Sequence, residues 1–391
     1  MAHATHSVSR LSLMRILPLT LTGFMAVMTE TMPVGMLKQL AQGLAINDSV
    51  AGQLVAVYAA GSFLAIIPVM TLTRGINRKI VLLSALAGFC VSNLAVAVTS
   101  VFWLVAVERF VAGVAAGSAW GLIAGYTVRV SPPDKAGRAL AIMGAGQPVA
   151  LAIAVPLVSS AVQVMPWHWV FALAAVMAAG IWLWCLLALP GVPGEPRGQR
   201  IPLVKIVTRG NIPAILLTLM CWITAHHALY TYISPYLDAV GHSDQLRLAL
   251  FIFGGASFVG IMVTSVFVDR ALNTITAVSL AGFVLAGLLF LWGGGNGALL
   301  MLGVVLWGFS FGGAPTLLVK YLADSAGKQI DMAQAAFATV FNTSIFTGAL
   351  VGGVVLYVAN ALGEPLLQIL LALTATLTWF FGVRKKSRLG A

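Results

Sequence analysis

Two acidic side chains, Glu30 and Glu108, lie inside long apolar stretches, whereas the other nine acids of the chain fall in loops or at the ends of such stretches. A carboxylate in an apolar medium costs several kcal/mol, on the order of two to four by insertion scales, unless it is paired, hydrated or protonated. An acid at such a position is therefore a candidate for binding a proton. Glu30 is the stronger candidate because it lies deep within its stretch.

Arg109 is the basic residue that could share a level with Glu30. If both stretches are membrane-crossing helices, Glu30 lies about 22 Å from the end where its helix begins, and Arg109 lies about 8 Å from the opposite surface. We therefore expect Glu30 and Arg109 to be electrostatic partners. The alternative is that Glu108 pairs with its neighbour Arg109 and that Glu30 only bonds helix backbone.

A third polar site is the run from residue 225 to residue 237, which holds His226, His227 and Tyr230 within an otherwise apolar stretch. His226 and Tyr230 share a helical face at spacing i, i+4, and the imidazole could bind a ligand or titrate near neutral pH. The alternative is a structural histidine with a satisfied hydrogen bond. Because no other His, Asp or Glu joins the two adjacent histidines, we expect no metal site.

Trp120 stands beside a stripe of small residues, Gly113, Gly117 and Gly121, spaced one turn apart. Such a stripe lets a neighbouring helix approach closely. Trp120 either lines a cavity or fills space against lipid or core.

The elements that position these residues are membrane helices. Of the 391 residues 60% are hydrophobic and 8% charged, against roughly 25% charged in soluble domains. Apolar stretches long enough to cross a bilayer are predicted at residues 15–37, 51–72, 80–98, 104–126, 139–162, 168–189, 213–237, 248–268, 276–293, 298–319, 333–358 and 366–383. The sequence predicts an all-α membrane protein of twelve transmembrane helices in two six-helix bundles, 1–189 and 213–391, joined by a cytoplasmic linker at 190–212 that begins with a run rich in Pro and Gly.

The positive charges indicate the orientation of these helices. Nineteen of the 22 Lys and Arg residues fall on one side if both termini are cytoplasmic, and only Lys38 and Arg247 fall in loops on the other. The net charge of +11 thus follows topology, so we expect a lipid-embedded protein that binds no nucleic acid. No predicted strand supports a hydrolase elbow, P-loop or dinucleotide fingerprint, so we expect no enzyme and no cofactor beyond a proton gradient.

Several motifs resemble those of the major facilitator superfamily, in its twelve-span drug:proton antiporter branch. The segment from Thr29 to Leu37 is similar to the branch pattern T-E-x-x-P-V-G-x-L, whose acid is a proton site, and Arg109 to Gly113 is similar to R-x-x-x-G, whose Arg serves proton coupling. Residues 144–157, with Gln147, Pro148 and Pro156, resemble the antiporter motif, although alanines at 150 and 154 stand where glycines are usual. By this resemblance Glu30 and Arg109 couple protons and the two prolines serve conformational change.

Two loops resemble the family's conformational latch. Residues 73–79, with Arg74 and Arg78, are a degraded form of D-R-x-G-R-R/K, and the counterpart in the second half keeps Asp269 and Arg270. Further similar segments are 307–315 and the Phe341–Asn342 pair.

The resemblance implies a proton-coupled antiporter, a monomer in the bacterial inner membrane, that exports a small polar or amphipathic solute. Sugar exporters and purine ribonucleoside exporters are the most similar types. The residues expected to bind substrate, which suit a sugar, a nucleoside or a drug equally, are Trp120, Gln147, His226, Tyr230 and Asn342. An importer on the same fold and a membrane sensor without turnover remain alternatives.

Overall fold

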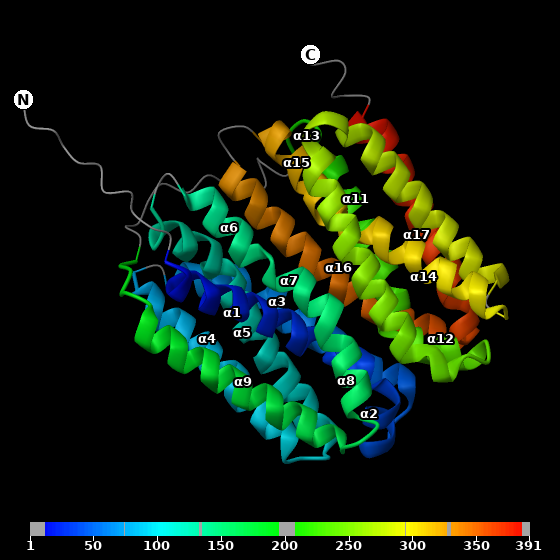
Figure 1. The fold of residues 1–391 in the computed structure, drawn as a ribbon, viewed down its shortest axis with the longest axis horizontal. Coiled ribbons are helices and arrows are strands. Elements are labelled where there is room, and N and C mark those ends of the chain that lie inside the picture. Colours follow the sequence, from blue (N-terminus) through cyan, green and yellow to red (C-terminus); the bar gives the residue numbers. More distant parts are fainter. Residues whose placement is uncertain are drawn as a thin grey trace, which may run out of the picture.

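The computed structural model describes residues 12–73, 75–132, 135–194, 208–293, 295–326 and 330–384, and these residues form two bundles of helices that lie side by side (Figure 1). The helices of the first bundle are α1 (Leu13–Gly35), α2 (Leu37–Gly43), α3 (Asp48–Leu72), α4 (Arg78–Ala97), α5 (Phe102–Arg129), α6 (Ala136–Gly144), α7 (Gly146–Val149), the π-helical η2 (Ala150–Ala154), α8 (Val155–Ala161) and α9 (Trp167–Ala188). We call this bundle, up to residue 194, the first half.

The second bundle, from residue 208 to residue 384, is the second half. Its helices are α11 (Ile212–Thr231), α12 (Ile233–Ala239), the short η3 (Ser243–Gln245), α13 (Leu246–Gly293), α14 (Gly297–Gly312), α15 (Ala314–Ala326), α16 (Ile330–Ala359), η5 (Ala361–Gly363), α17 (Glu364–Thr378) and η6 (Trp379–Arg384). In Figure 1 it is coloured from green-yellow to red.

Eleven helical stretches among the described residues are long and apolar enough to cross a membrane. One of them contains α13, whose backbone leaves helical geometry at Ala271 (φ −139°, ψ 33°), so this stretch provides two crossings. The twelve crossings predicted from the sequence are therefore present. Backbone groups in hydrocarbon must be satisfied within the segment, which is why apolar runs of this length fold as helices.

Each half has its own hydrophobic core. One large cluster of buried side chains contains residues of the first half alone, and a second is built on the second half with a few first-half residues at the junction, such as Val34, Val55 and Val155. A third, small cluster packs first-half residues such as Leu37 against Tyr232 of the second half. The position of the boundary between two domains remains a prediction.

The two halves repeat one another in detail. Gly113 of α5 packs against the carbonyl of Tyr58 on α3, and Gly308 of α14 packs against the carbonyl of Phe253 on α13, at the same spacing along the chain. In each case an added Cβ would lie within 2.5 Å of that oxygen. Small residues thus let paired helices touch through their backbones in both halves.

A second repeated feature lies at the end of the first helix of each half. α1 leaves helical geometry at Met36, before the seven-residue α2, and α11 does so at Tyr232, before the seven-residue α12. Glu30 precedes the first break by the same number of residues as His226 precedes the second. The two titratable residues therefore occupy corresponding positions.

The halves are tied together at the end of the molecule where α2 and α12 lie, which we call the α2 end (Figure 1). Lys38 Nζ lies 2.8 Å from Asp238 Oδ1, and Ser49 Oγ donates to the carbonyl of Gly353 (2.7 Å). The Tyr232 hydroxyl accepts from Gln53 Nε2 (3.1 Å) and donates to the carbonyl of Ala349 (2.9 Å). These contacts close the junction of the halves at this end.

Candidate functional site

Arg109 is fixed in the first half by main-chain oxygens. Its guanidinium donates to the carbonyls of Thr29, Glu30 (3.1 Å) and Leu54 (3.4 Å), and it lies over the ring of Tyr58, 4.7 Å from the centroid. Only 1% of Arg109 is exposed. Three carbonyls and an aromatic face thus compensate a buried cation without a carboxylate partner.

The structure brings Glu30 and Arg109 together, but through the backbone of Glu30. Neither residue forms an ion pair within the described parts of the chain, while the Glu30 carboxylate still lies within electrostatic range of Arg109 and Tyr58. Glu30 is also within electrostatic range of Tyr230, which belongs to the second half. The acid is therefore near both the arginine of the first half and the polar run of α11. Glu108, the alternative partner, is half-buried next to Arg109 on α5.

The polar run of α11 is packed into a group of rings, the aromatic cluster, formed by His226, Tyr230, Phe253, Trp307 and Phe311. The His226 ring stacks on Phe311, with centroids 3.5 Å apart and planes 13° apart, and on Tyr230 at 5.1 Å. Phe253 and Trp307 close the group at 4.4 Å from one another. The side chains of this polar run are buried because aromatic rings from α13 and α14 cover it.

Several polar atoms of the aromatic cluster have no partner. His226 Nδ1, the Tyr230 hydroxyl and Trp307 Nε1 are buried and make no hydrogen bond with the described residues, and Ser257 Oγ and Trp222 Nε1 lie in the same half in the same condition. A buried polar group without a partner costs about 1–3 kcal/mol. Such a concentration of unused donors and acceptors beside flat rings is suited to a ligand that is itself flat and polar at its edges.

The other predicted substrate residues are spread around the junction. Asn342 on α16 accepts through Oδ1 from Ser62 Oγ of α3 (2.9 Å), which joins the two halves. Trp120 is half-buried on α5 and packs near Gly23 of α1. Gln147 is half-buried on α7. Of the five predicted substrate residues, only His226 and Tyr230 are in direct ring contact.

The segment that resembles the antiporter motif is irregular. Pro148 lies in the short α7, and the π-helical η2 separates it from Pro156 at the start of α8. At η2 the backbone of Ala152 comes so close to Gly254 of α13 that an added Cβ there would lie 2.4 Å from Ala152 Cα. A π-helical segment thus lies where the two halves are in contact. Such segments are frequent at functional sites.

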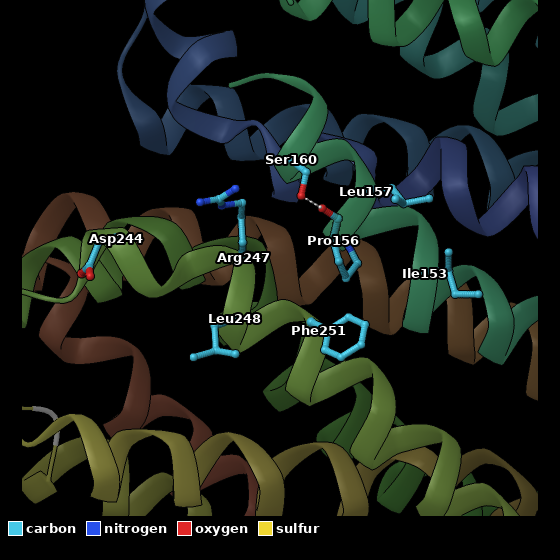
Figure 2. A pocket seen from close by; sticks show the side chains of 8 residues that line it. All are labelled: Ile153, Pro156, Leu157, Ser160, Asp244, Arg247, Leu248 and Phe251. Atoms are coloured by element: carbon cyan, nitrogen blue, oxygen red, sulfur yellow. Dashed lines mark hydrogen bonds between the residues drawn. The ribbon is translucent and has the colours of Figure 1, made fainter. Parts of the chain in front are cut away.

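A groove of about 460 Å³ opens beside this contact (Figure 2). Pro156, Leu157 and Ser160 line it from the first half, and Arg247 and Phe251 line it from the second. Ser160 Oγ donates to the carbonyl of Pro156 (2.9 Å), as the dashed line in Figure 2 marks.

Three of the four residues predicted to form a latch, Arg78, Asp269 and Arg270, lie at the opposite end from α2. Asp269 pairs with Lys320 of α15 (3.7 Å), which also pairs with Asp324 (2.9 Å), and Arg270 lines a polar pocket of about 710 Å³ beside them. The backbone N–H of Arg78 donates to the carbonyl of Val192 (2.8 Å) at the start of α4. Arg74 lies outside the described residues.

Sequence reasoning missed four residues of these sites. Three of them are the aromatic residues Phe253, Trp307 and Phe311. Nothing in the sequence marks them as parts of a site, because only the packing of α13 and α14 brings them to His226. Glu364 was assigned to the end of a span, but its side chain is fully buried (0% exposed). No group of three or more His, Cys, Asp or Glu residues suited to a metal ion occurs among the described residues.

Comparison with known proteins identifies the family. The model described as Major Facilitator Superfamily matches residues 19–349. The purine ribonucleoside efflux pump NepI of Shigella sonnei (strain Ss046) is 32% identical over 336 residues, which is 84% of this chain and 83% of the relative, and NepI of Escherichia coli (strain K12) is 31% identical over 335 residues with the same coverage.

Solved structures share the fold. A mutant of the nucleoside transporter NupG superposes with a TM-score of 0.72 at 14% identity, covering 93% of this chain and 98% of the other. The human organic anion transporter MFSD10 superposes with a TM-score of 0.69 at 15% identity, over the same shares of the two chains. The chain belongs to the major facilitator superfamily and is a multi-pass membrane transporter, not an enzyme.

Proposed function

We propose that this transporter exports purine ribonucleosides from bacteria in exchange for protons. The relatives at 32% and 31% identity carry the name of a purine ribonucleoside efflux pump, which favours this substrate over the sugars and drugs that the sequence left open. In the proposal the linker end and both termini face the cytoplasm, as the excess of Lys and Arg at that end suggests, and the α2 end faces the periplasm.

The observation that carries the substrate assignment is the set of unpartnered polar atoms inside the aromatic cluster. A purine base has a flat π face and edges that both donate and accept hydrogen bonds. His226 Nδ1, the Tyr230 hydroxyl and Trp307 Nε1 can pair with such edges, and the rings can stack on the base. In our proposal the His226 ring moves off Phe311 when the base enters.

Glu30 supplies the proton site in this proposal. The carboxylate lies in electrostatic range of Arg109 in the first half and of Tyr230 in the second, so a change in its charge acts on the junction between the two halves. Coupling requires the proton and the nucleoside to stabilise different states, since a ligand that binds both states equally shifts nothing. Protonation from the periplasm and release to the cytoplasm would then drive export as the halves rock against one another.

The test is transport in proteoliposomes with an imposed pH gradient. We would compare inosine, arabinose and a cationic dye in the wild type, in Glu30→Gln, and in Glu108→Gln as the matched control, since Glu108 is the second acid that the sequence analysis placed inside an apolar stretch and adjoins Arg109. We expect gradient-driven movement of inosine in the wild type and in Glu108→Gln, and its loss in Glu30→Gln.

Three results would contradict the proposal. Transport of arabinose or dye without inosine would move the substrate class to sugars or drugs. If Glu30→Gln transports inosine at the full pH-dependent rate and Glu108→Gln does not, Glu108 and not Glu30 is the proton site. Inosine movement in the same direction as the proton would make the protein an importer.

A further inference from the structure

Glu364 is a buried acid that the proposed transport cycle does not use. It is the first residue of α17, at the α2 end, and its side chain is completely buried. Both carboxylate oxygens lack a hydrogen-bond partner among the described residues, and no ion pair there includes Glu364. An ionised carboxylate in such surroundings is strongly disfavoured.

The position of Glu364 at the start of a helix does not stabilise its ionised form. A helix N-terminus stabilises a carboxylate when backbone N–H groups point at it. Neither oxygen of Glu364 receives such a bond. The group is therefore neutral as the chain is folded here, which means that it holds a proton.

A second buried polar side chain, with an unused acceptor, lies one turn further along α17. Gln368 shares a helical face with Glu364 at spacing i, i+4 and is also completely buried. Its amide nitrogen donates to the carbonyl of Phe283 (3.3 Å), which leaves Oε1 without a partner. A protonated carboxyl can donate a hydrogen bond to an unused acceptor of this kind, whereas an ionised carboxylate only accepts.

Glu364 also lies next to the contacts that close the α2 end. It is within electrostatic range of Tyr232, whose hydroxyl bridges Gln53 and Ala349. The elements that pack against η5 and α17 are α11, α12, α13 and α16. The titratable or charged groups on these elements and their flanking loops, toward the α2 end, are His226, His227, Tyr230, Tyr232, Tyr236, Asp238, His242, Arg247 and Tyr357. None of them forms an ion pair with Glu364 within the described ranges.

We propose that Glu364 is a second proton-binding residue, which holds a proton while the α2 end is closed and releases it when water enters between α12, η5 and α17. Ionisation of Glu364 needs hydration, and hydration requires these elements to separate. A high pH on the side of the membrane that the α2 end faces therefore favours the open α2 end, and a low pH on that side favours the closed one. This inference does not depend on the identity of the substrate.

The first measurement is infrared spectroscopy of the full-length protein in lipid nanodiscs at pH 7. Glu30→Gln serves as the background, so that the proposed proton site contributes no signal, and Asp244→Asn, which removes an exposed acid at the same end, is the matched control. We expect a protonated-carboxyl band in Glu30→Gln that keeps its intensity when Asp244→Asn is added and loses intensity when Glu364→Gln is added. A band of unchanged intensity in the Glu30→Gln, Glu364→Gln double variant would overturn the proposal.

The second measurement is thermal unfolding of the same proteins between pH 6 and pH 9. The unfolded chain releases a glutamate proton in mildly acidic solution, so a proton kept only by the folded state makes stability fall as the pH rises. We expect this fall in the wild type and a flatter profile in Glu364→Gln. Equal slopes of stability against pH in the two proteins would contradict the proposal. A stabilisation by sodium ions that Glu364→Gln abolishes would also contradict it, because the site would then bind a metal cation. If Glu364→Gln does not fold, Glu364→Met, an apolar residue of similar volume, takes its place in both measurements.

Discussion

The two halves of the transporter place different chemistry at corresponding positions. Glu30 of α1 and His226 of α11 precede equivalent breaks in their helices, yet one is accompanied by a buried arginine and the other by aromatic rings. Phe253, which corresponds to Tyr58, packs on Trp307, whereas Tyr58 packs on Arg109. A repeated scaffold thus carries a charged site in one half and an uncharged site in the other.

The difference lies in how the polar atoms are satisfied. Arg109 donates to three carbonyls, so its place is fixed by the backbone of α1 and α3. In the aromatic cluster the imidazole, hydroxyl and indole groups have no partners among the described residues. Groups that are already satisfied suit a permanent electrostatic role, and groups with unused hydrogen-bonding capacity suit a ligand that comes and goes.

The largest expected effect comes from Arg109→Met. This change removes the cation and leaves three buried carbonyls without their donor, so we expect proton-driven efflux to fall by at least about 100-fold, or about 2.7 kcal/mol in the barrier. Arg109→Lys keeps the charge but not the planar fork, and we expect it to recover only part of the rate. Efflux per folded protein in proteoliposomes is the measurement. Full activity in Arg109→Met would remove the contrast between the two halves.

A matched pair of glycine substitutions sharpens the comparison. Gly113→Ala and Gly308→Ala each force a methyl group against a backbone carbonyl, at 2.0 Å and 2.5 Å in the unrelaxed structure. Overpacking of this kind costs about 1–3 kcal/mol, so we expect both to lower the unfolding temperature. Because Gly113 contacts Tyr58, which packs on Arg109, we expect only Gly113→Ala to impair proton coupling beyond its effect on stability. Equal losses of coupling in the two variants would count against the division of roles.

Tyr230→Phe tests the aromatic cluster with a smaller effect. It removes a hydroxyl that has no partner here and that the proposal assigns to the nucleoside, so we expect the KM for inosine to rise about 10-fold, or about 1.4 kcal/mol. Tyr236→Phe is the matched control, since that hydroxyl already donates to the carbonyl of Phe290 (2.7 Å). Initial efflux rates over a range of inosine concentrations give the comparison. If both variants leave KM unchanged, the cluster does not bind the substrate.

The helices of this protein were predictable from sequence, and part of the site was not. Apolar stretches of membrane length predicted all twelve crossings because hydrocarbon leaves the backbone almost no alternative to the helix. The proximity of Glu30 to Arg109 followed from counting residues along two helices. The aromatic cluster could not be predicted in this way, because the rotation of α13 and α14 about their axes decides which of many phenylalanines and tryptophans contacts His226. Glu364 was missed because its burial depends on α11, α12, α13 and α16, which pack against η5 and α17, rather than on its own neighbours in the chain.

The smallest expected effect is at the ion pair that joins the halves at the α2 end. Lys38 and Asp238 are 33% and 54% exposed, so their attraction is screened by water and salt and is worth about 0.2–1 kcal/mol. Asp238→Asn should therefore shift the balance between closed and open α2 ends by less than about five-fold, and the shift should shrink at high salt. The balance can be followed by the distance between spin labels attached at the α2 end of the two halves. The exchanged pair Lys38→Asp, Asp238→Lys should restore the wild-type distribution. If Asp238→Asn instead opens the α2 end completely, the hydrogen bonds of Tyr232 and Ser49 are not what holds it closed, and the ion pair is the main closing contact between the two halves.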